Sequence, residues 1–332
     1  MRVLVVGAGS IGGYFGGRLL AAGRNVTFLV RSQRAAQLAQ TGLIIRSPHG
    51  DLDLLTPPTI TVETLSTVSE PFDLILLSVK AYSLDAAMDS FAPAVAPHTR
   101  ILPLLNGMRH LDQLDARFSA DQVLGGLAMI STMLDAQGRI LHLGEVDNLV
   151  FGTRDSAHSE QIEAISTTLL GAGFAARRSD TIVQEMWEKW VFIAACAGIT
   201  CLMRAAIGDL IAADAGDLAV TLLSECAAIA AEEGVASSTA ALERSRAILT
   251  TPGSPLTASM LRDIENGSPI EADHIIGDLL HRSAKNKTML RTVYAHLKSY
   301  EARRTHEMGQ IGSRSPMPDA MLGQKEGQHE TR

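Results

Sequence analysis

The chain has 332 residues, of which 46% are hydrophobic and 20% are charged, and its net charge is −7. This length is enough for two domains with substantial cores, and the composition is that of an ordinary globular protein. The acidic balance argues against nucleic acid or an anionic membrane as the main partner. The longest apolar run, residues 190–203, is too short to span a bilayer, so we expect a buried helix there.

The cysteines and the first residues indicate the compartment. Cys196, Cys201 and Cys226 lie in apolar surroundings without metal-binding spacing, so we expect reduced, buried thiols and no metal site. The first apolar run covers only residues 3–6, and no small-residue cleavage site follows it. This pattern favours a strand over a signal peptide. Together these observations predict a cytoplasmic protein.

A glycine-rich turn follows that first strand and precedes a helical pattern. In the spacing G-x-G-x-x-G, the first glycine allows a tight turn, the second lets backbone N–H groups approach a pyrophosphate, and the third lets the helix pack closely. The helix N-terminus then favours an anion. A tight turn can also serve packing alone, but the strand and helix on either side favour a dinucleotide site. Its residues are Gly7, Ala8, Gly9, Ser10, Ile11 and Gly12.

The second predicted strand, residues 25–31, ends in Arg31. An NAD enzyme carries Asp or Glu roughly twenty residues beyond the glycines, where the carboxylate accepts a hydrogen bond from the ribose 2′-hydroxyl. Arg31 cannot accept that bond, but a guanidinium suits a 2′-phosphate, and Arg34 is a candidate second contact. The end of the strand therefore favours NADP(H). The alternative is a solvated arginine at a strand end.

Strands and helices alternate through the first half of the chain, which predicts an α/β domain of Rossmann type with a parallel-sheet core. From residue 180 the pattern changes to long, alanine-rich helical segments, which predict an all-α domain. We place an NADP-binding domain at residues 1–175, a helical domain at 176–304 and a disordered or loosely attached tail at 305–332. Within the first domain we expect a short helix at 33–40, a hairpin of 43–45 with 52–55, buried strands at 73–79 and 101–105, a run of shorter strands across 122–151, and a helix at 160–170.

Two polar side chains directly follow predicted buried strands. Lys80 ends one strand and Asn106 ends the next, so both belong to the carboxyl edge where an open parallel sheet binds its ligands. Lys80 is placed to contact a cofactor phosphate or ribose. Asn106, in a turn with Gly107, is placed to contact the nicotinamide or the substrate, although such a residue can also simply stabilise its own loop.

The helical half contains a lysine with apolar neighbours. Lys189, Ile193 and Ala197 fall on one helix face, at positions i, i+4 and i+8. Desolvation there lowers the pKa of an ammonium, which helps it donate a proton to an alkoxide that develops on a ketone. The alternative is a lysine whose stem covers apolar surface while its charge reaches water.

A third polar cluster comes later in the helical half. Residues 259–266 predict the end of a helix, Gly267 its stop, and Glu271 the first turn of the next helix. Carboxylates at such positions commonly interact with the helix dipole and have no further role.

Taken together, these motifs resemble the ketopantoate reductase (2-dehydropantoate 2-reductase) family, from Met1 to about Glu301. Members of that family are NADPH enzymes with an N-terminal Rossmann domain and a C-terminal helical domain. Six motifs in the same order carry the resemblance: the glycine-rich turn, Arg31, V-K-A-aromatic at 79–82, N-G-M at 106–108, W-E-K at 187–189, and S-M-x-x-D at 259–263 with the later Glu271.

The resemblance implies a reaction and a set of roles. NADPH would reduce ketopantoate or a related 2-oxo acid, in the first case to pantoate for pantothenate biosynthesis. Lys189 would be the general acid, with Asn106 and Glu271 in the catalytic set. Asn106 and Ser259 would orient the substrate, while Glu271 would also help hold substrate or cofactor. Family habit further suggests a homodimer formed through the helical domain.

The chain departs from the family at the substrate face. Ile193 and Ala197 occupy positions where the family has asparagines that contact substrate, and Ile207 replaces a third asparagine. Each missing amide partner weakens recognition of a polyhydroxylated substrate by about 1–3 kcal/mol. A more apolar 2-oxo acid or ketone is therefore an alternative substrate. Two further alternatives are a non-catalytic NADPH-binding sensor and another two-domain dehydrogenase, such as a β-hydroxyacid enzyme.

Overall fold

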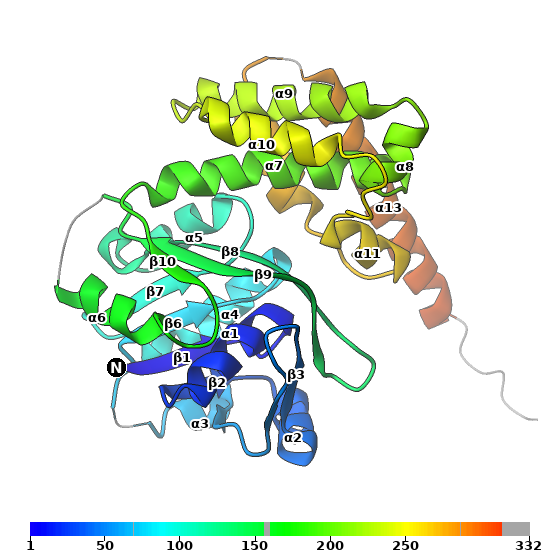
Figure 1. The fold of residues 1–332 in the computed structure, drawn as a ribbon. Helices are drawn as coiled ribbons and strands as arrows, with labels where there is room; N and C mark the ends of the chain where they lie inside the picture. Colours follow the sequence, from blue (N-terminus) through cyan, green and yellow to red (C-terminus); the bar gives the residue numbers. More distant parts are fainter. Residues whose placement is uncertain (69, 156–159, 286, 314–332) are drawn as a thin grey trace, which may run out of the picture.

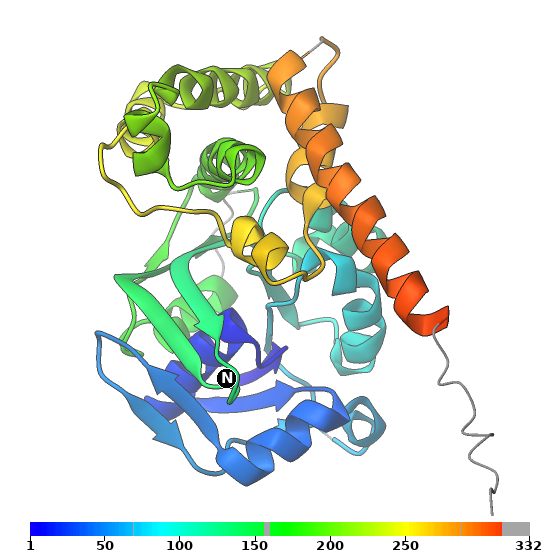
Figure 2. The same cartoon turned by 90° about the vertical axis from the view of Figure 1, so that its right-hand side faces the viewer.

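The computed structural model describes residues 1–68, 70–155, 160–285 and 287–313. Two sheets and their helices form one part of the molecule, and a group of helices packs over one side of it (Figure 1). The view turned by 90° shows the long C-terminal helix extending beyond both parts (Figure 2). The predicted combination of a Rossmann-type α/β domain and a helical domain is confirmed.

The first sheet has five parallel strands in the order β5-β2-β1-β6-β7. Its central strands β2, β1 and β6 contain residues such as Phe28, Val5 and Leu76 that are wholly buried, as expected for a sheet covered on both faces. The strands are β1 (Arg2–Val6), β2 (Asn25–Leu29), β5 (Thr59–Ile60), β6 (Leu74–Leu77) and β7 (Arg100–Pro103). The helical segments of this half are α1 (Ser10–Ala21), α2 (Ser32–Thr41), α3 (Val62–Leu65), η1 (Ala81–Ser83), α4 (Leu84–Phe91), η2 (Ala92–Ala94), α5 (Arg109–Arg117), η3 (Ala120–Gln122) and α6 (Glu160–Leu169).

A second, mixed sheet packs beside the first. Its strand order is β10-β9-β3-β4, where β10 is Ala176–Arg178, and β8 pairs antiparallel with β9. The predicted hairpin is confirmed as β3 (Leu43–Arg46) and β4 (Leu52–Leu54). The run of shorter strands expected across residues 122–151 is wrong, because two long strands, β8 (Gly125–Leu134) and β9 (Ile140–Gly152), span it. Their register shifts between Ile130 and Thr132. Such an irregularity disrupts the alternation of apolar and polar residues that identifies a continuous strand.

The helical half is built around α7 (Ile182–Met203), which contains the apolar run of the sequence. Its length and composition would suit a membrane span, but 67% of its apolar window is buried inside the protein, so α7 is a core helix. Burial raises the pKa of Cys196 and Cys201 to about 12, as expected for unreactive thiols. The other segments are α8 (Ile207–Ala212), α9 (Gly216–Glu232), α10 (Thr239–Leu249), α11 (Ser259–Glu265), the π-helix η4 (Asp273–Gly277), α12 (Asp278–His281) and α13 (Thr288–Ser313).

The limits expected for the helical domain, residues 176 and 304, stay predictions. Strand β10 (Ala176–Arg178) pairs with β9, so we propose that the first domain extends through this strand. At the other end, α13 continues through residues 305–313. Once a helix has formed, each added residue gains one hydrogen bond and needs no new nucleus. A helix can therefore continue beyond its last apolar contact. The remainder of the expected tail lies outside the described residues.

Candidate active site

The glycine-rich turn has the geometry of a phosphate site. Gly7 has φ +95°, and a Cβ on Gly12 would lie 2.2 Å from the Gly7 carbonyl oxygen, so both positions require glycine. A Cβ on Gly9, by contrast, would meet no atom within 4 Å. Gly9 caps α1 without a side-chain hydrogen bond, and the first turn of α1 contains no acidic residue. The helix therefore presents open space, uncapped N–H groups and no competing carboxylate, which fits a dinucleotide pyrophosphate.

Two arginines follow β2 beside this turn. Arg31 is the exposed N-cap residue of α2. The Arg34 Nε donates to the Ala8 carbonyl at 3.2 Å, and both of its Nη atoms lie 3.3 Å from the Gly138 carbonyl oxygen. Neither arginine has a carboxylate within 4.0 Å among the residues that the structure describes. Burial lowers the pKa of Arg34, since no counter-ion compensates its desolvation. The Arg34 Nη1 also donates to the Gln37 Oε1 at 2.6 Å. The charge of the two arginines is therefore not matched by a carboxylate, and the binding of a phosphate there stays a prediction.

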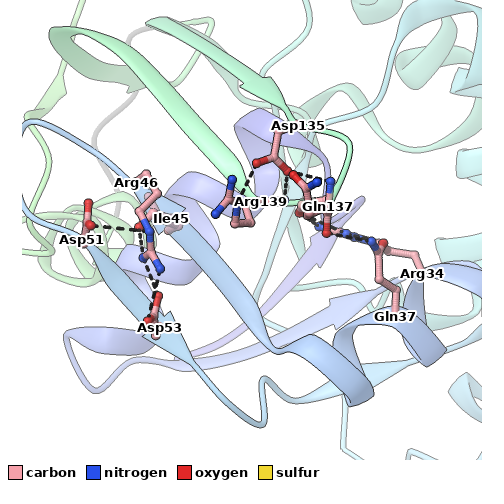
Figure 3. A network of polar contacts seen from close by, with 10 residues as sticks. Arg34, Gln37, Ile45, Arg46, Asp51, Asp53, Asp135, Gln137 and Arg139 are labelled. Carbon is pink, nitrogen blue, oxygen red and sulfur yellow. Dashed lines mark hydrogen bonds and ion pairs between the residues drawn. The ribbon is translucent and has the colours of Figure 1, made fainter.

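The tip of the β8–β9 hairpin closes over this region, as Figure 3 shows. The Gln37 amide donates to the Gln137 carbonyl at 3.2 Å, and Asp135 and Arg139 pair across the turn at 2.6 Å. Gly138 has φ +76°, and a Cβ there would lie 2.3 Å from the Gln37 Nε2 atom. Sequence reasoning missed this contact, because the hairpin tip and α2 are about a hundred residues apart in the chain.

The strands β6 and β7 end earlier than predicted, so Lys80 and Asn106 each lie three residues beyond a strand, at the carboxyl edge of the first sheet. The Lys80 Nζ lies 2.9 Å from Asp263 and 3.2 Å from Glu271, both of the helical domain. Glu271 also accepts a hydrogen bond from the Ala81 backbone N–H at 2.9 Å. Burial opposes the charge of Lys80, but the two carboxylates raise its pKa. Lys80 therefore bridges the two domains, and since its charge is already matched, we infer that a ribose hydroxyl suits it better than a phosphate.

Lys189 and Asn106 come together from the two domains at one narrow cavity, and Ile193 lies on its wall. The Lys189 Nζ donates to the Ala128 carbonyl of β8 at 2.8 Å. Burial lowers the pKa of Lys189 to about 8, against the opposing effect of the Glu271 carboxylate. A lysine with this pKa can donate a proton near neutral pH. The cavity is lined by Leu105, Asn106, Gly107, Gly126, Leu127, Met186, Lys189, Trp190 and Ile193.

Two of the expected substrate residues do not line this cavity. Ser259 is the exposed first residue of α11, one turn before Asp263, and Ala197 is buried one turn beyond Ile193. Their contacts with substrate stay predictions. Sequence reasoning missed Leu127 and Met186 in the lining of this cavity. Met186 could have been found, because it lies three residues before Lys189 and so on the same helix face. No group of three metal-ligating side chains occurs among the described residues.

Comparison with known proteins identifies the family. The description "Ketopantoate reductase PanE/ApbA" matches residues 3–156, and "Ketopantoate reductase PanE/ApbA C terminal" matches residues 181–301. The chain belongs to this family. It is therefore an oxidoreductase, and its family uses a nicotinamide cofactor and a small 2-oxo acid.

Individual relatives of this PanE/ApbA protein have different names. An uncharacterized oxidoreductase YkpB of Bacillus subtilis is 40% identical over 91% of this chain and 99% of its own length. The crystal structure of 2-dehydropantoate 2-reductase from Methylococcus capsulatus is 26% identical, with a TM-score of 0.81 over 92% of this chain and 98% of that one. D-mandelate dehydrogenase, solved with NADH and anilino(oxo)acetate, shares the fold at 20% identity, with a TM-score of 0.81 over 92% and 100% of the two chains. Membership in the family thus leaves the substrate open.

Proposed function

We propose that this protein is an NADPH-dependent reductase of a 2-oxo acid, of the 2-dehydropantoate 2-reductase type, with Lys189 as the general acid. The observation that carries the proposal is the meeting of Lys189 and Asn106 at one interdomain cavity, where the pKa of Lys189 falls to about 8. NADPH, when bound, supplies a hydride to the ketone carbon. The protein contributes the proton, the orientation of the substrate and the exclusion of water.

The hydrogen bonding of the Lys189 ammonium leaves N–H groups for the substrate. One of its three N–H groups is used by the Ala128 carbonyl, which leaves two for a substrate oxygen. In the proposed step Lys189 donates one proton to the ketone oxygen as the hydride reaches the carbon. The Asn106 amide holds the substrate against the lysine. Among the described residues, the Glu271 carboxylate pairs with Lys80 and not with Lys189, but its charge raises the pKa of Lys189 and so favours the protonated form.

The preference for NADPH is supported by the two arginines at the end of β2. Arg31 and Arg34 have no carboxylate partner among the described residues, and Arg34 contacts the carbonyl of Ala8 in the glycine-rich turn. A planar guanidinium binds a phosphate through two parallel hydrogen bonds. The 2′-phosphate of NADP would supply the missing negative charge.

The substrate that fits best has an apolar side chain. Leu127, Met186 and Ile193 line the cavity beside Lys189 and Asn106, and Ile193 replaces an amide that the resemblance led us to expect. A hydroxylated substrate would leave polar groups unpaired against these side chains. D-mandelate dehydrogenase, which has the same fold, was solved with an aryl-substituted oxo acid derivative. We therefore propose branched or aryl 2-oxo acids as better substrates than ketopantoate. A role in pantothenate biosynthesis would require that ketopantoate be reduced.

A turnover assay tests this function. Purified protein is mixed with NADPH or NADH and with ketopantoate, a branched aliphatic 2-oxo acid or phenylglyoxylate, and the loss of reduced-cofactor absorbance is followed. We expect the highest kcat/KM with NADPH and an apolar acid. Turnover of ketopantoate above the apolar acids would contradict the substrate assignment. Tight NADPH binding without turnover of any oxo acid would support the sensor alternative instead.

A further inference from the structure

The tip of the β8–β9 hairpin, residues 135–139, contacts α2 of the cofactor half (Figure 3). Helix α2 begins directly after Arg31, and its Arg34 reaches back to the Ala8 carbonyl in the glycine-rich turn. The hairpin tip, α2 and the glycine-rich turn therefore meet at Arg34. The proposed reaction has so far given the tip no role.

Three uncharged acceptors hold the Arg34 guanidinium. Its Nε donates to the Ala8 carbonyl at 3.2 Å and its Nη1 to the Gln37 side-chain oxygen at 2.6 Å, while both Nη atoms lie 3.3 Å from the Gly138 carbonyl oxygen. Among the described residues, Nη2 contacts only this carbonyl, which leaves it an N–H for a ligand. The contacts thus fix the position of the side chain without neutralising its charge.

The charges of the tip are matched within the tip itself. Asp135 is the one acidic residue of 135–139. Its carboxylate accepts hydrogen bonds from the backbone N–H groups of Gln137 and Arg139 at 3.0 and 2.8 Å, and from the Arg139 Nε at 2.6 Å. The tip therefore presents a carbonyl to Arg34 in place of a carboxylate. A carboxylate there would cancel the charge of the guanidinium and repel an anionic ligand.

Gly138 allows the tip to approach α2 this closely. Its φ of +76° already favours glycine. In addition, a Cβ at this position would lie 2.3 Å from the Gln37 Nε2 and 2.8 Å from the Arg34 Nη1. Both atoms are the ends of flexible side chains, so a larger residue would displace Gln37 and Arg34. The absence of a side chain at position 138 is thus a condition for the observed position of the guanidinium.

We propose that the hairpin tip is a determinant of cofactor specificity, in which Gly138 and Gln37 hold Arg34 in place for the adenosine 2′-phosphate of NADPH. Gly138 and Gln37 are positioning residues, and Arg34 supplies the charge and the N–H group. A guanidinium that is fixed before binding loses less conformational entropy when the phosphate arrives. The proposal rests on the preference for NADPH within the proposed function.

A glycine pair tests the role of the tip. We expect Gly138→Ala to raise the Kd for NADPH about 3- to 10-fold, the cost of ordering one long side chain on binding. The Kd for NADH should change less than about twofold, since NADH has no 2′-phosphate. Gly23→Ala is the matched control: Gly23 has φ +75°, but a Cβ there would meet no atom within 4 Å. It carries the same backbone strain and should leave both Kd values unchanged.

A charge pair tests the uncharged acceptor in α2. Gln37→Glu places a carboxylate where the amide oxygen accepts from Arg34. We expect the Kd for NADPH to rise about tenfold and the Kd for NADH to stay within about twofold. The melting temperature should not fall, because an ion pair replaces a neutral hydrogen bond. Gln40→Glu adds the same charge to an exposed position in the last turn of α2 and is the control.

A double variant shows whether the tip acts through Arg34. In Arg34→Ala, the further change Gly138→Ala should leave the ratio of the two Kd values unaltered, because the side chain that it displaces is absent. An undiminished effect of Gly138→Ala in that background, or an equal rise of both Kd values in the single variant, would overturn the proposal.

The wild type separates this proposal from the proposed function. Equal Kd values of the wild type for NADPH and NADH would refute the cofactor preference of the proposed function, and this proposal with it. A wild-type preference for NADPH that survives both Gly138→Ala and Gln37→Glu would overturn this proposal alone. Since all these measurements are of binding, a protein that reduces no oxo acid would refute the reductase function and leave the role of the tip standing.

Discussion

Lys80 and Lys189 both lie where the two domains meet, and their surroundings act on their pKa values in opposite ways. Lys80 meets Asp263 and Glu271, which raise its pKa in spite of burial. Lys189 meets a backbone carbonyl and apolar side chains, and burial lowers its pKa to about 8. Lys80 therefore keeps a charge that links the domains, whereas Lys189 can donate a proton near neutral pH.

The comparison teaches that the residue type alone does not decide the role of a lysine. Each lysine belongs to a motif of the sequence, V-K-A-aromatic for Lys80 and W-E-K for Lys189. Both are partly buried between the domains. The difference comes from the carboxylates that α11 and the segment before η4 bring to Lys80. Glu271 forms an ion pair with Lys80 but affects Lys189 only through its charge.

Removal of the Lys189 ammonium should have the largest effect. We expect Lys189→Ala to lower kcat about 10²- to 10⁴-fold, the usual contribution of a general acid. The Kd for NADPH, measured by protein fluorescence, should stay within about twofold, because the glycine-rich turn is distant from the lysine in sequence and in role. Lys298→Ala, which changes a lysine of α13 paired with Asp273 and Glu301, is the control. Activity of Lys189→Ala within threefold of the wild type would refute the assignment of the acid.

Removal of Arg34 tests the cofactor end. We expect Arg34→Ala to raise the KM for NADPH about 10- to 100-fold and to leave the KM for NADH nearly unchanged, since only NADPH carries the 2′-phosphate. Arg46→Ala is a matched control, because Arg46 lies in the same region but already pairs with Asp51 and Asp53 (Figure 3). Equal effects on both cofactors would mean that Arg34 serves the fold and not the phosphate.

The pH dependence of kcat reports the environment of Lys189 directly. The acid acts only while protonated, so kcat should be level below pH 8 and should fall about tenfold per pH unit above the pKa of about 8. An unperturbed lysine would move this fall to about pH 10.4. Lys189→Arg, whose guanidinium does not titrate in this range, should show no such fall in whatever activity remains.

Substitution of Ile193 tests the apolar wall of the cavity. We expect Ile193→Asn to shift the ratio of kcat/KM for ketopantoate over an apolar 2-oxo acid about tenfold toward ketopantoate, because the amide supplies a partner for a hydroxyl. Ile193→Val keeps the wall apolar and should leave the ratio unchanged. A shift of the same size with valine would show that cavity volume, and not polarity, selects the substrate.

The smallest effect concerns the buried histidine His110. Its pKa is well below 6.5 in the folded state, so the unfolded state binds more protons and the stability of the wild type falls as the pH drops below about 6.5. The loss approaches about 1.4 kcal/mol per pH unit for one histidine. Thermal unfolding between pH 7 and pH 5 should show a shallower loss in His110→Leu, and parallel curves for the two proteins would contradict this.

The local elements of the cofactor half could be predicted from the sequence because their determinants are close together in the chain. Gly7, Gly9 and Gly12 span six residues, and β1, α1 and β2 lie within the first thirty residues. The same holds for the helix face that carries Lys189 and Ile193. In each case period and turn chemistry are sufficient.

The rest of the site could not be predicted, since it depends on contacts between distant segments. The pairing of Lys80 with Asp263 joins residues 183 positions apart, and the hairpin tip that meets Arg34 comes from a strand pair whose irregular register hid it. The sequence also did not predict that the rings of His110 and His274 lie 5.5 Å apart. A histidine within an apolar pattern has the same sequence signature whether or not another histidine packs against it.

By itself the sequence determined a Rossmann turn, a helical second domain and a lysine on an apolar helix face. Only the tertiary structure decided which lysine keeps its charge and which side chains line the cavity. The physical reason is that strand and helix patterns depend on neighbours along the chain, whereas desolvation and charge pairing depend on neighbours in space.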